Sequence, residues 1–471
     1  MFAALLVITF HVLGAISAIH AVMSTRTSQG AIAWAVSLVT FPYVAVPAYW
    51  VLGRTKFQGY VSARRDTDVR NQHLEEEAVE RVRRFRVEPP DRHESAHAAE
   101  ALAGMPILGG NHVDLLVDGN ATFDSILEGI DAAEEYVLFQ FFIVKDDELG
   151  TRVKEHLIAK SRQGVRVYFL YDEVGSHALS SSYLNELRES GVQVSEFNTR
   201  KGRGNRFQLN FRNHRKVVVV DGKYAWIGGH NVGDEYVGKS EFGHWRDTHV
   251  RIEGPAVLKA QLSFCEDWAW ATDAVPPLNW RPHAAKNGGD AAVLIIPTGP
   301  ADDLETANLM FVHAIHSATS RIWIASPYFV PDEAVMVALQ LAGLRGVDVR
   351  LLIPDNPDHL LVYLAAFSYF DQAGQTGVKF YRYLDGFLHQ KVMLIDDGVA
   401  TVGTANFDNR SFRLNFEITA AVANAAFVTQ VERMFEDDLQ HARLMEEGEY
   451  DRKPWWFRLG VRLARLTSPI Q

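Results

Sequence analysis

The first 60 residues contain two long apolar runs and no Asp or Glu. The first run extends from Phe2 to Met23, and the second extends from Gly30 to Leu52. Each has about 22 residues, enough for a helix to cross a hydrocarbon layer of roughly 30 Å. A cleaved signal peptide also begins with an apolar run, but here no basic segment precedes it and a second run follows closely. The pattern therefore predicts two retained transmembrane helices within residues 1–60.

Basic residues are distributed unevenly around these two runs. The connector between the runs carries only Arg26. Four basic residues follow the second run: Arg54, Lys56, Arg64 and Arg65. Because basic residues accumulate on the cytoplasmic side of a membrane, we expect the N-terminus and the bulk of the chain in the cytoplasm. The protein is then a multi-pass protein of the cell inner membrane.

Charged segments flank the central part of the chain on both sides. Residues 61–105 are helix-prone and turn at Pro89-Pro90, which predicts a juxtamembrane helix and linker. Residues 451–471 interleave basic residues with bulky apolar ones such as Trp455 and Trp456. This composition is typical of a helix at a membrane surface, so we expect the C-terminal tail to contact the membrane.

Between these segments, short apolar strands alternate with helical stretches, and the whole pattern occurs twice. This alternation favours an α/β fold in which β-sheets are flanked by helices. A duplicated sequence predicts two related lobes, 106–280 and 281–450, packed about a pseudo-twofold axis. The corresponding segments include Val137–Ile143 with Trp323–Phe329, and Gly164–Asp172 with Gly346–Asp355.

The composition narrows the range of functions. The chain has 471 residues and a formal net charge of −11, which argues against a general nucleic-acid binder. Cys265 is the only cysteine, so a disulfide framework and a Cys-based zinc site are excluded within one chain. Four histidines have no recognisable metal-ligand spacing: His112, His230, His244 and His249. We therefore expect no metal, no other cofactor and no nucleic-acid partner.

One motif repeats at the same spacing in both halves. In the first copy, Lys216 comes two residues after His214, Asp221 five residues later, and Asn231 ten residues after that. The second copy has the same spacings in His389, Lys391, Asp396 and Asn406. A His and a Lys two positions apart project from one face of a strand. There an imidazole can attack or protonate a phosphoryl group while the ammonium and the asparagine amide hold its oxygens.

Two copies in related lobes predict one shared site, because a twofold axis brings equivalent strand ends together. Asp221 and Asp396 lie at an odd spacing from the lysines, so both a structural turn role and a catalytic role remain open for them. Each histidine needs a carboxylate that fixes its tautomer. We expect Glu417, which lies 28 residues after His389, and Asp247 in the first half to supply these carboxylates.

These motifs resemble those of the phospholipase D superfamily, His-x-Lys-x4-Asp-x6-Gly-(Gly/Ser/Thr)-x-Asn, which this chain carries twice. The order of segments from the apolar runs onward is similar to that of bacterial cardiolipin synthases. One small departure is the strand Phe139-Gln-Phe-Phe142, where that family more often has tyrosines. The shared segments include Tyr171-Asp172-x-x-Gly175-Ser176, Arg212-Asn213-His214-Arg215-Lys216, Trp245-Arg246-Asp247 and Asn406-Phe-Asp408-Asn-Arg410-Ser411.

The resemblance implies a reaction, in which a phosphatidyl group passes from one phosphatidylglycerol to another to give cardiolipin and glycerol. By analogy His214 would attack phosphorus, and His389 would act as acid and then base. The motif equally supports water as acceptor, which is a phospholipase D, and the same chemistry extends to a phosphatidylserine synthase. The apolar runs favour a lipid acceptor and disfavour a nuclease. The donor preference and the oligomeric state are not determined by the sequence.

Overall fold

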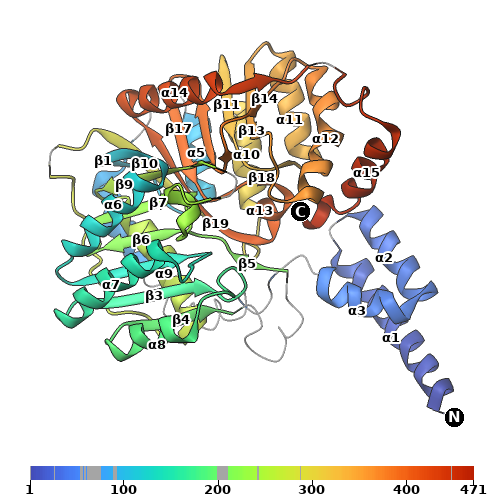
Figure 1. Ribbon diagram of the computed structural model, residues 1–471, viewed down its shortest axis with the longest axis horizontal. Coiled ribbons are helices and arrows are strands. Elements are labelled where there is room, and N and C mark those ends of the chain that lie inside the picture. The colour runs from blue at the N-terminus through green and yellow to red at the C-terminus, as the bar shows by residue number, and fades with distance from the viewer. Residues whose placement is uncertain are drawn as a thin grey trace.

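The computed structural model consists of a large α/β body and an N-terminal arm of helices (Figure 1). The α/β class predicted from the alternating pattern is confirmed. Much of the predicted linker 61–105 lies outside the described residues; within it, α5 spans His93–Ala103. The structure describes residues 2–25, 27–53, 57, 60, 76–87, 93–198, 210–240, 243–286, 288–446 and 448–471.

The first half of the body contributes seven strands to one mixed sheet. From the outer edge inward their order is β4-β3-β2-β6-β7-β9-β1. The inner strands β2 and β3 are parallel, whereas β2, β6, β7, β9 and β1 pair in antiparallel fashion. These strands are β1 (Leu108–Val117), β2 (Tyr136–Phe141), β3 (Arg166–Asp172), β4 (Gln193–Phe197), β6 (Val217–Val220), β7 (Tyr224–Gly228) and β9 (Thr248–Glu253).

The second half repeats this order. It reads β14-β13-β11-β16-β17-β19-β10 from the edge inward, with β20 added outside β14. The two halves join where β1 pairs antiparallel with β10, so the repeated sequence becomes a repeated strand order. These strands are β10 (Ala291–Thr298), β11 (Arg321–Ala325), β13 (Asp348–Pro354), β14 (Lys379–Tyr383), β16 (Val392–Ile395), β17 (Val399–Gly403), β19 (Asn415–Ala423) and β20 (Ala442–Leu444).

Helices flank the sheet in both halves. Equivalent helices α7 and α11 begin at capping aspartates, because the side chains of Asp147 and Asp332 accept the N–H of the third residue along. The helices of the first half are α6 (Asp118–Asp131), α7 (Glu148–Arg162), α8 (Ser181–Glu189) and α9 (Val257–Thr272). Those of the second half include α10 (Thr306–Ser317), α11 (Glu333–Leu344), α12 (Leu360–Gly374), α14 (Ala425–Gln440) and α15 (Trp455–Arg465).

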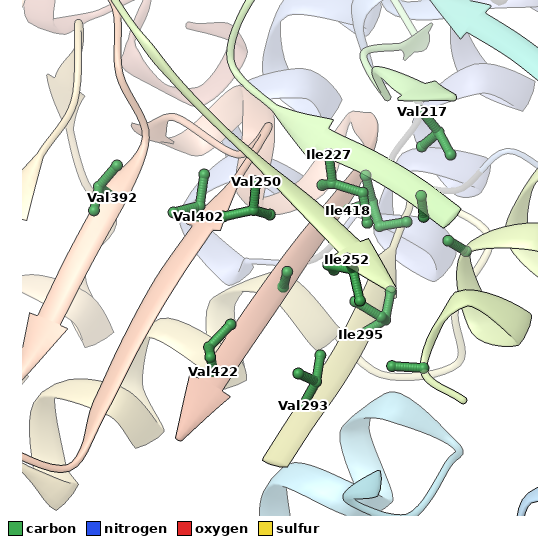
Figure 2. Close-up of a cluster of buried hydrophobic side chains, with 14 of the residues drawn as sticks. Val217, Ile227, Val250, Ile252, Val293, Ile295, Val392, Val402, Ile418 and Val422 are labelled. Atoms are coloured by element: carbon green, nitrogen blue, oxygen red, sulfur yellow. The ribbon is translucent and has the colours of Figure 1, made fainter. Parts of the chain in front are cut away.

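One hydrophobic core is shared by the two halves. Figure 2 shows side chains of β6, β7 and β9 from the first half close to those of β10, β16, β17 and β19 from the second. They include Ile227 and Val250 on one side and Val402 and Ile418 on the other, all fully buried. Separating the halves would expose this apolar surface to water, so the two halves stabilise each other.

A buried ion pair also links the halves. The Arg246 guanidinium, in the first half, donates from Nε and Nη2 to the two carboxylate oxygens of Asp438 on α14, at 2.7 and 3.1 Å. Both side chains are 6% exposed. Arg215 makes a second bridge, because it binds Asp267 in its own half at 2.9 Å and donates to the Glu417 carbonyl in the other.

The N-terminal arm differs in part from the prediction of two membrane-spanning helices. The first apolar run forms α1 (Phe2–Ser24), of which Ala4–Ser24 is long and apolar enough to cross a membrane. The second run is divided into α2 (Ser28–Thr40) and α3 (Pro42–Leu52). Phe41 breaks the helix with φ −138° and ψ 57°, directly before a proline that disfavours helical geometry in the preceding residue. Two complete spans are therefore not confirmed.

The helices α2 and α3 form a hairpin against α1. The end of α2 lies beside the middle of α1, where Gly14 leaves room for the carbonyl of Leu38. The end of α3 lies beside the second half of α1: Trp50 donates to Ser17 at 3.0 Å, and Tyr49 bonds His20 at 2.6 Å. The chain thus leaves α3 at the same end of α1 at which it entered α2.

The interlobe ion pair leads to a stability prediction. Asp438→Asn leaves the buried Arg246 charge with only the partly exposed carboxylate of Asp118, at 3.2 Å, and removing one partner of a buried pair costs about 3–5 kcal/mol. We expect the midpoint of thermal unfolding of the detergent-purified chain to fall by roughly 5 °C. The control is Asp437→Asn, at the neighbouring exposed position of α14. Equal midpoints for the two variants would contradict the role of the pair.

Candidate active site

The segment before His214 crosses from the first half to the second. Its short strand β5 (Arg212–Asn213) pairs in parallel with β19, and Asn213 lies opposite Phe416. The His214 N–H then donates to the Phe416 carbonyl at 2.9 Å. This register places the His214 side chain next to Glu417 on the strand of the other half.

The segment before His389 makes the reciprocal crossing. Its strand β15 (Phe387–Leu388) pairs in parallel with β8 (Trp245–Arg246) of the first half. The His389 N–H donates to the Arg246 carbonyl at 2.8 Å, which places this histidine next to Asp247. The two halves therefore exchange short strands at the same point of the duplicated motif.

The result is a pair of crossed His–carboxylate hydrogen bonds. Nδ1 of His214 lies 2.9 Å from Oε2 of Glu417, and Nδ1 of His389 lies 2.7 Å from Oδ2 of Asp247. Both carboxylates are fully buried. A nitrogen that faces a carboxylate carries the proton, so Nε2 of each imidazole keeps its lone pair for reaction. The structure brings both predicted carboxylates to the histidines, each from the opposite half.

The two motif lysines are held close to the histidines. Lys216 Nζ donates to the carbonyl of His214 at 2.7 Å. Lys391 Nζ donates to the carbonyl of His389 and lies 3.0 Å from its Nδ1. Both lysines are buried, and burial, together with the nearby Lys391 charge, holds the pKa of Lys216 well below its usual value.

Burial shifts the pKa of each of these groups. It lowers the pKa of His214 to about 4, although Glu417 opposes the shift. Burial and the lysine charges hold the pKa of His389 well below its usual value. Burial lowers the pKa of Lys391 to about 8, against the attraction of Asp247. At neutral pH the imidazoles are therefore neutral, as a nucleophile or base must be, and Lys391 still carries its charge.

The motif asparagines lie in the same buried region. Asn231 donates from Nδ2 to the hydroxyl of Tyr236 at 3.0 Å and accepts from the Ile143 N–H. Asn406 is buried, and among the described residues its side-chain Oδ1 has no hydrogen-bond partner. Because the two ends of an amide are assigned from their partners, this end can present either a donor or an acceptor to a ligand.

The motif aspartates lie at the far end of the strands that follow the histidines. Asp221 and Asp396 have φ of 54° and 50°, in the left-handed region. The Asp221 carboxylate accepts three backbone N–H groups, of residues 134, 135 and 136. That of Asp396 accepts the equivalent groups of residues 319, 320 and 321. Burial opposes its ionisation, but these N–H donors outweigh burial and lower the pKa of Asp396.

Three further residues contact the crossed pairs. The Tyr236 hydroxyl lies 3.3 Å from Nδ1 of His389. The Thr404 hydroxyl donates to Glu417 at 2.6 Å. Gly229, at the corresponding motif position, contacts Asp247 so closely that a Cβ would overlap its carboxylate. The variable Gly/Ser/Thr position of the motif was the signal for Gly229 and Thr404, whereas nothing in the motif pointed to Tyr236.

The remaining histidines lie apart from any metal arrangement. His230 is buried, and its Nδ1 lies 2.9 Å from Nδ1 of His249. Burial lowers the pKa of both to about 3, so they are neutral. In the part of the chain that the structure describes, no group of three or more His, Cys, Asp and Glu side chains could hold a metal ion.

The arrangement suits covalent phosphoryl transfer. Two imidazoles with oriented Nε2 atoms, two ammonium groups and two amides converge from equivalent positions of a duplicated α/β fold. One imidazole can form a bond to phosphorus while the other moves the proton of an alcohol, and the cations stabilise the oxygens in the transition state. The fold and the site thus define a phosphoryl-transfer protein with phospholipase D-like lobes.

Comparison with known proteins assigns the chain to a particular family. Residues 126–268 and 311–439 match the family described as "Cardiolipin synthase, PLD-like domain". Cardiolipin synthase A of Pseudomonas fluorescens (strain SBW25) is 50% identical over 471 residues, covering 98% of this chain and 97% of the relative. Cardiolipin synthase A of Pseudomonas putida (strain F1) is 49% identical, covering 98% and 96%. The chain therefore belongs to the cardiolipin synthase family with a PLD-like domain.

Solved structures share the fold at low sequence identity. Phosphatidylserine synthase of Haemophilus influenzae Rd KW20 is 15% identical, with a TM-score of 0.58 over 80% of this chain and 100% of that chain. Polyphosphate kinase of Porphyromonas gingivalis is 11% identical, with a TM-score of 0.50 over 82% of this chain and 56% of that chain. At such identity these likenesses describe the fold alone.

The pKa of Lys391 leads to a prediction about pH. The ammonium is present below about pH 8 and is lost above it, so kcat/KM should fall as the pH rises through that value. Lys391→Arg keeps its charge throughout this range, because a guanidinium does not deprotonate in proteins. We expect the variant to be less active at pH 7 but to lack the fall near pH 8. An unchanged alkaline limb in Lys391→Arg would assign the titration to another group.

Proposed function

We propose that this protein transfers a phosphatidyl group from one phosphatidylglycerol to another, forming cardiolipin and releasing glycerol. The crossed hydrogen bonds of His214 with Glu417 and of His389 with Asp247 are the observation that carries this proposal. They orient two imidazoles from different halves at one centre, which a two-step displacement requires. The relatives named cardiolipin synthase, at half identity over nearly the full length, support a lipid acceptor.

In the first step, Nε2 of His214 attacks phosphorus, forming a P–N bond as the P–O bond to glycerol breaks. For this step His389 must be the imidazolium, a form that Asp247 and the bound anionic phosphate stabilise, and it gives its Nε2 proton to the departing glycerol oxygen. In the second step, His389 takes the proton of the hydroxyl of the incoming phosphatidylglycerol. Its oxygen then bonds to phosphorus and the P–N bond breaks, so the enzyme is restored.

The other motif residues have supporting roles in this proposal. Four side chains hold the phosphoryl oxygens as charge develops on them: Lys216, Lys391, Asn231 and Asn406. Asp247 and Glu417 orient the imidazoles and stabilise their charged forms. The bonds of Asp221 and Asp396 to backbone N–H groups support a structural role in place of a catalytic one. No step needs a metal or another cofactor.

The alternative is hydrolysis with water as acceptor, as in a phospholipase D. Water is available to any site in the cytoplasm, whereas a lipid acceptor can reach the site only if the site lies beside a bilayer. The apolar helix α1 and the membrane-type surface of α15 both support a position beside a bilayer. On α15, Trp455 and Trp456 are 70% and 62% exposed, next to a row of arginines.

The proposed domain plan follows the sequence boundaries. It consists of a membrane arm (1–60), a linker (61–105), two lobes (106–280 and 281–450) and a membrane-contacting tail (451–471). The lobes are proposed to lie on the cytoplasmic face of the inner membrane.

Two arrangements of the arm are compatible with cytoplasmic lobes. The sequence predicts two complete spans, which would place the N-terminus in the cytoplasm as well. The hairpin geometry favours one span, α1, and a pair α2–α3 that enters the bilayer from the lobe side and returns to it. At 13 residues, α2 extends about 20 Å, less than the roughly 30 Å of a hydrocarbon layer. We favour the hairpin, in which the N-terminus lies outside the cytoplasm.

Product analysis tests the reaction. Purified full-length protein is incubated in detergent with labelled phosphatidylglycerol, and the lipids are separated. We expect cardiolipin and an equal amount of glycerol, and we expect His214→Ala and His389→Ala each to lower turnover by at least about a thousandfold. Surface His177→Ala in the first lobe is the matched control. Phosphatidic acid without cardiolipin would identify a hydrolase, and substantial turnover in either variant would refute the two-half site.

Reporter fusions test the arrangement of the arm. One reporter is active only outside the cytoplasm and a second only inside, and each is fused to either end of the chain. The hairpin predicts an external N-terminus and an internal C-terminus, because no basic residue precedes α1 whereas several follow it. Internal reporters at both ends would favour two complete spans, and an external C-terminus would reject both arrangements.

A further inference from the structure

A groove in the second half lies between the end of β11, the loop after β13, and the helix α12. Its walls are largely apolar. Asp358 and His359 border it, and the buried guanidinium of Arg382, which pairs with Asp355, forms part of one wall. The apolar lining includes Phe329, Ile353, Val362, Ala366 and Phe370. Neither the proposed chemistry nor the motif uses this groove.

The inner end of the groove adjoins the catalytic centre. Tyr328 lines it and donates its hydroxyl to Asp358 at 2.6 Å. The groove residue Phe329 pairs with Phe407, which directly follows the motif residue Asn406. A lipid whose phosphate lies between the motif residues would therefore place the part of the molecule next to the phosphate in this groove.

The outer end of the groove meets an exposed apolar surface. Leu360 and Leu361, in the first turn of α12, are 65% and 58% exposed directly beside the groove residue Val362. The helix α15 packs on α12, with the Phe457 and Phe367 rings 5.1 Å apart. Its opposite side exposes a stripe of bulky apolar residues: Trp455, Trp456, Leu459, Leu463 and Leu466.

The arginines of α15 follow a second stripe beside the apolar one. They occur at positions 458, 462 and 465, which repeat at the spacing of one helical face. A helix with adjoining apolar and cationic stripes fits a bilayer that carries anionic head groups. The outer end of the groove thus opens beside the surface that best fits a membrane.

The duplication supplies an internal comparison. In the first half, the position equivalent to Tyr328 is Phe142, whose ring packs on Gly175 and lies 4.9 Å from the His214 ring. The helix equivalent to α12 is α8, whose exposed residues are polar, such as Ser181 and Glu189. The apolar groove and the exposed leucines are therefore not a general consequence of the fold.

We propose that this groove takes one segment of an acyl chain of the phospholipid substrate, whose remainder runs over Leu360 and Leu361, and that lipid enters the site from the bilayer between α12 and the loop after β11. The inference rests on the proposed function for its lipid substrate. It adds the route of entry and a chain-length preference set by the second half.

Chain-length selectivity tests the route. The full-length protein is assayed with dioleoyl-phosphatidylglycerol in mixed micelles and with soluble dihexanoyl-phosphatidylglycerol, and consumption of the donor is measured. Ala366→Trp fills the groove from α12. We expect it to lower the ratio of kcat/KM for the long-chain to the short-chain lipid about tenfold, since loss of two buried methylene contacts has that effect.

If the tryptophan variant does not fold, the surface double variant Leu360→Ser/Leu361→Ser tests the route instead. We expect it to lower the same ratio of kcat/KM for the long-chain to the short-chain lipid. Val174→Ser is the matched control, because Val174 is 42% exposed in the corresponding loop of the first half. A ratio that does not change in a folded groove variant, or that falls equally in Val174→Ser, overturns the proposal. Consumption of the donor lipid measures its entry into the site whether the product is cardiolipin or phosphatidic acid. Failure of the synthase reaction is therefore a separate outcome.

Discussion

The exchange of two short strands between the halves is the constraint on which the site depends. Because β5 pairs with β19 and β15 pairs with β8, each motif histidine stands beside a carboxylate of the other half. Either half alone would bury a carboxylate without its imidazole, which is costly in an apolar interior. The shared core and the Arg246–Asp438 pair hold the halves in the register that the exchange requires.

The two half-sites are related but not identical. In the proposed reaction one imidazole bonds to phosphorus while the other moves protons, and identical surroundings would not separate these roles. His389 has a tyrosine hydroxyl beside it, whereas His214 packs against Phe142 and its carboxylate is held by Thr404. These departures from symmetry lie in the residues next to the motif, while the motif itself is kept in both copies.

The membrane features gather toward the second half. In Figure 1 the arm α1–α3 lies on the same side of the molecule as α12 and α15. The groove beside α12, the proposed route of lipid entry, lies in the same half. A protein whose two substrates are both lipids needs such a path, because the reacting phosphate must leave the head-group region while the acyl chains stay out of water.

The sequence by itself determined the α/β class, the duplication and the residues of the two motifs. These features are local, since strand periodicity and motif spacing are read from neighbouring positions along the chain. It also named Asp247 and Glu417, but not which histidine each would serve. The sequence did not show that the second apolar run is divided at Phe41, nor that Tyr236 lies beside His389.

Only the tertiary structure decided the crossed pairing, because its two hydrogen bonds join residues 203 and 142 positions apart. Glu417 and His214 are separated by 203 residues, and no spacing along the chain distinguishes this partner from His389. The choice depends on how β5 and β15 pair with strands of the opposite half, and thus on packing between the halves. The motif fixed which groups react, and the packing of the two halves fixed which groups face each other.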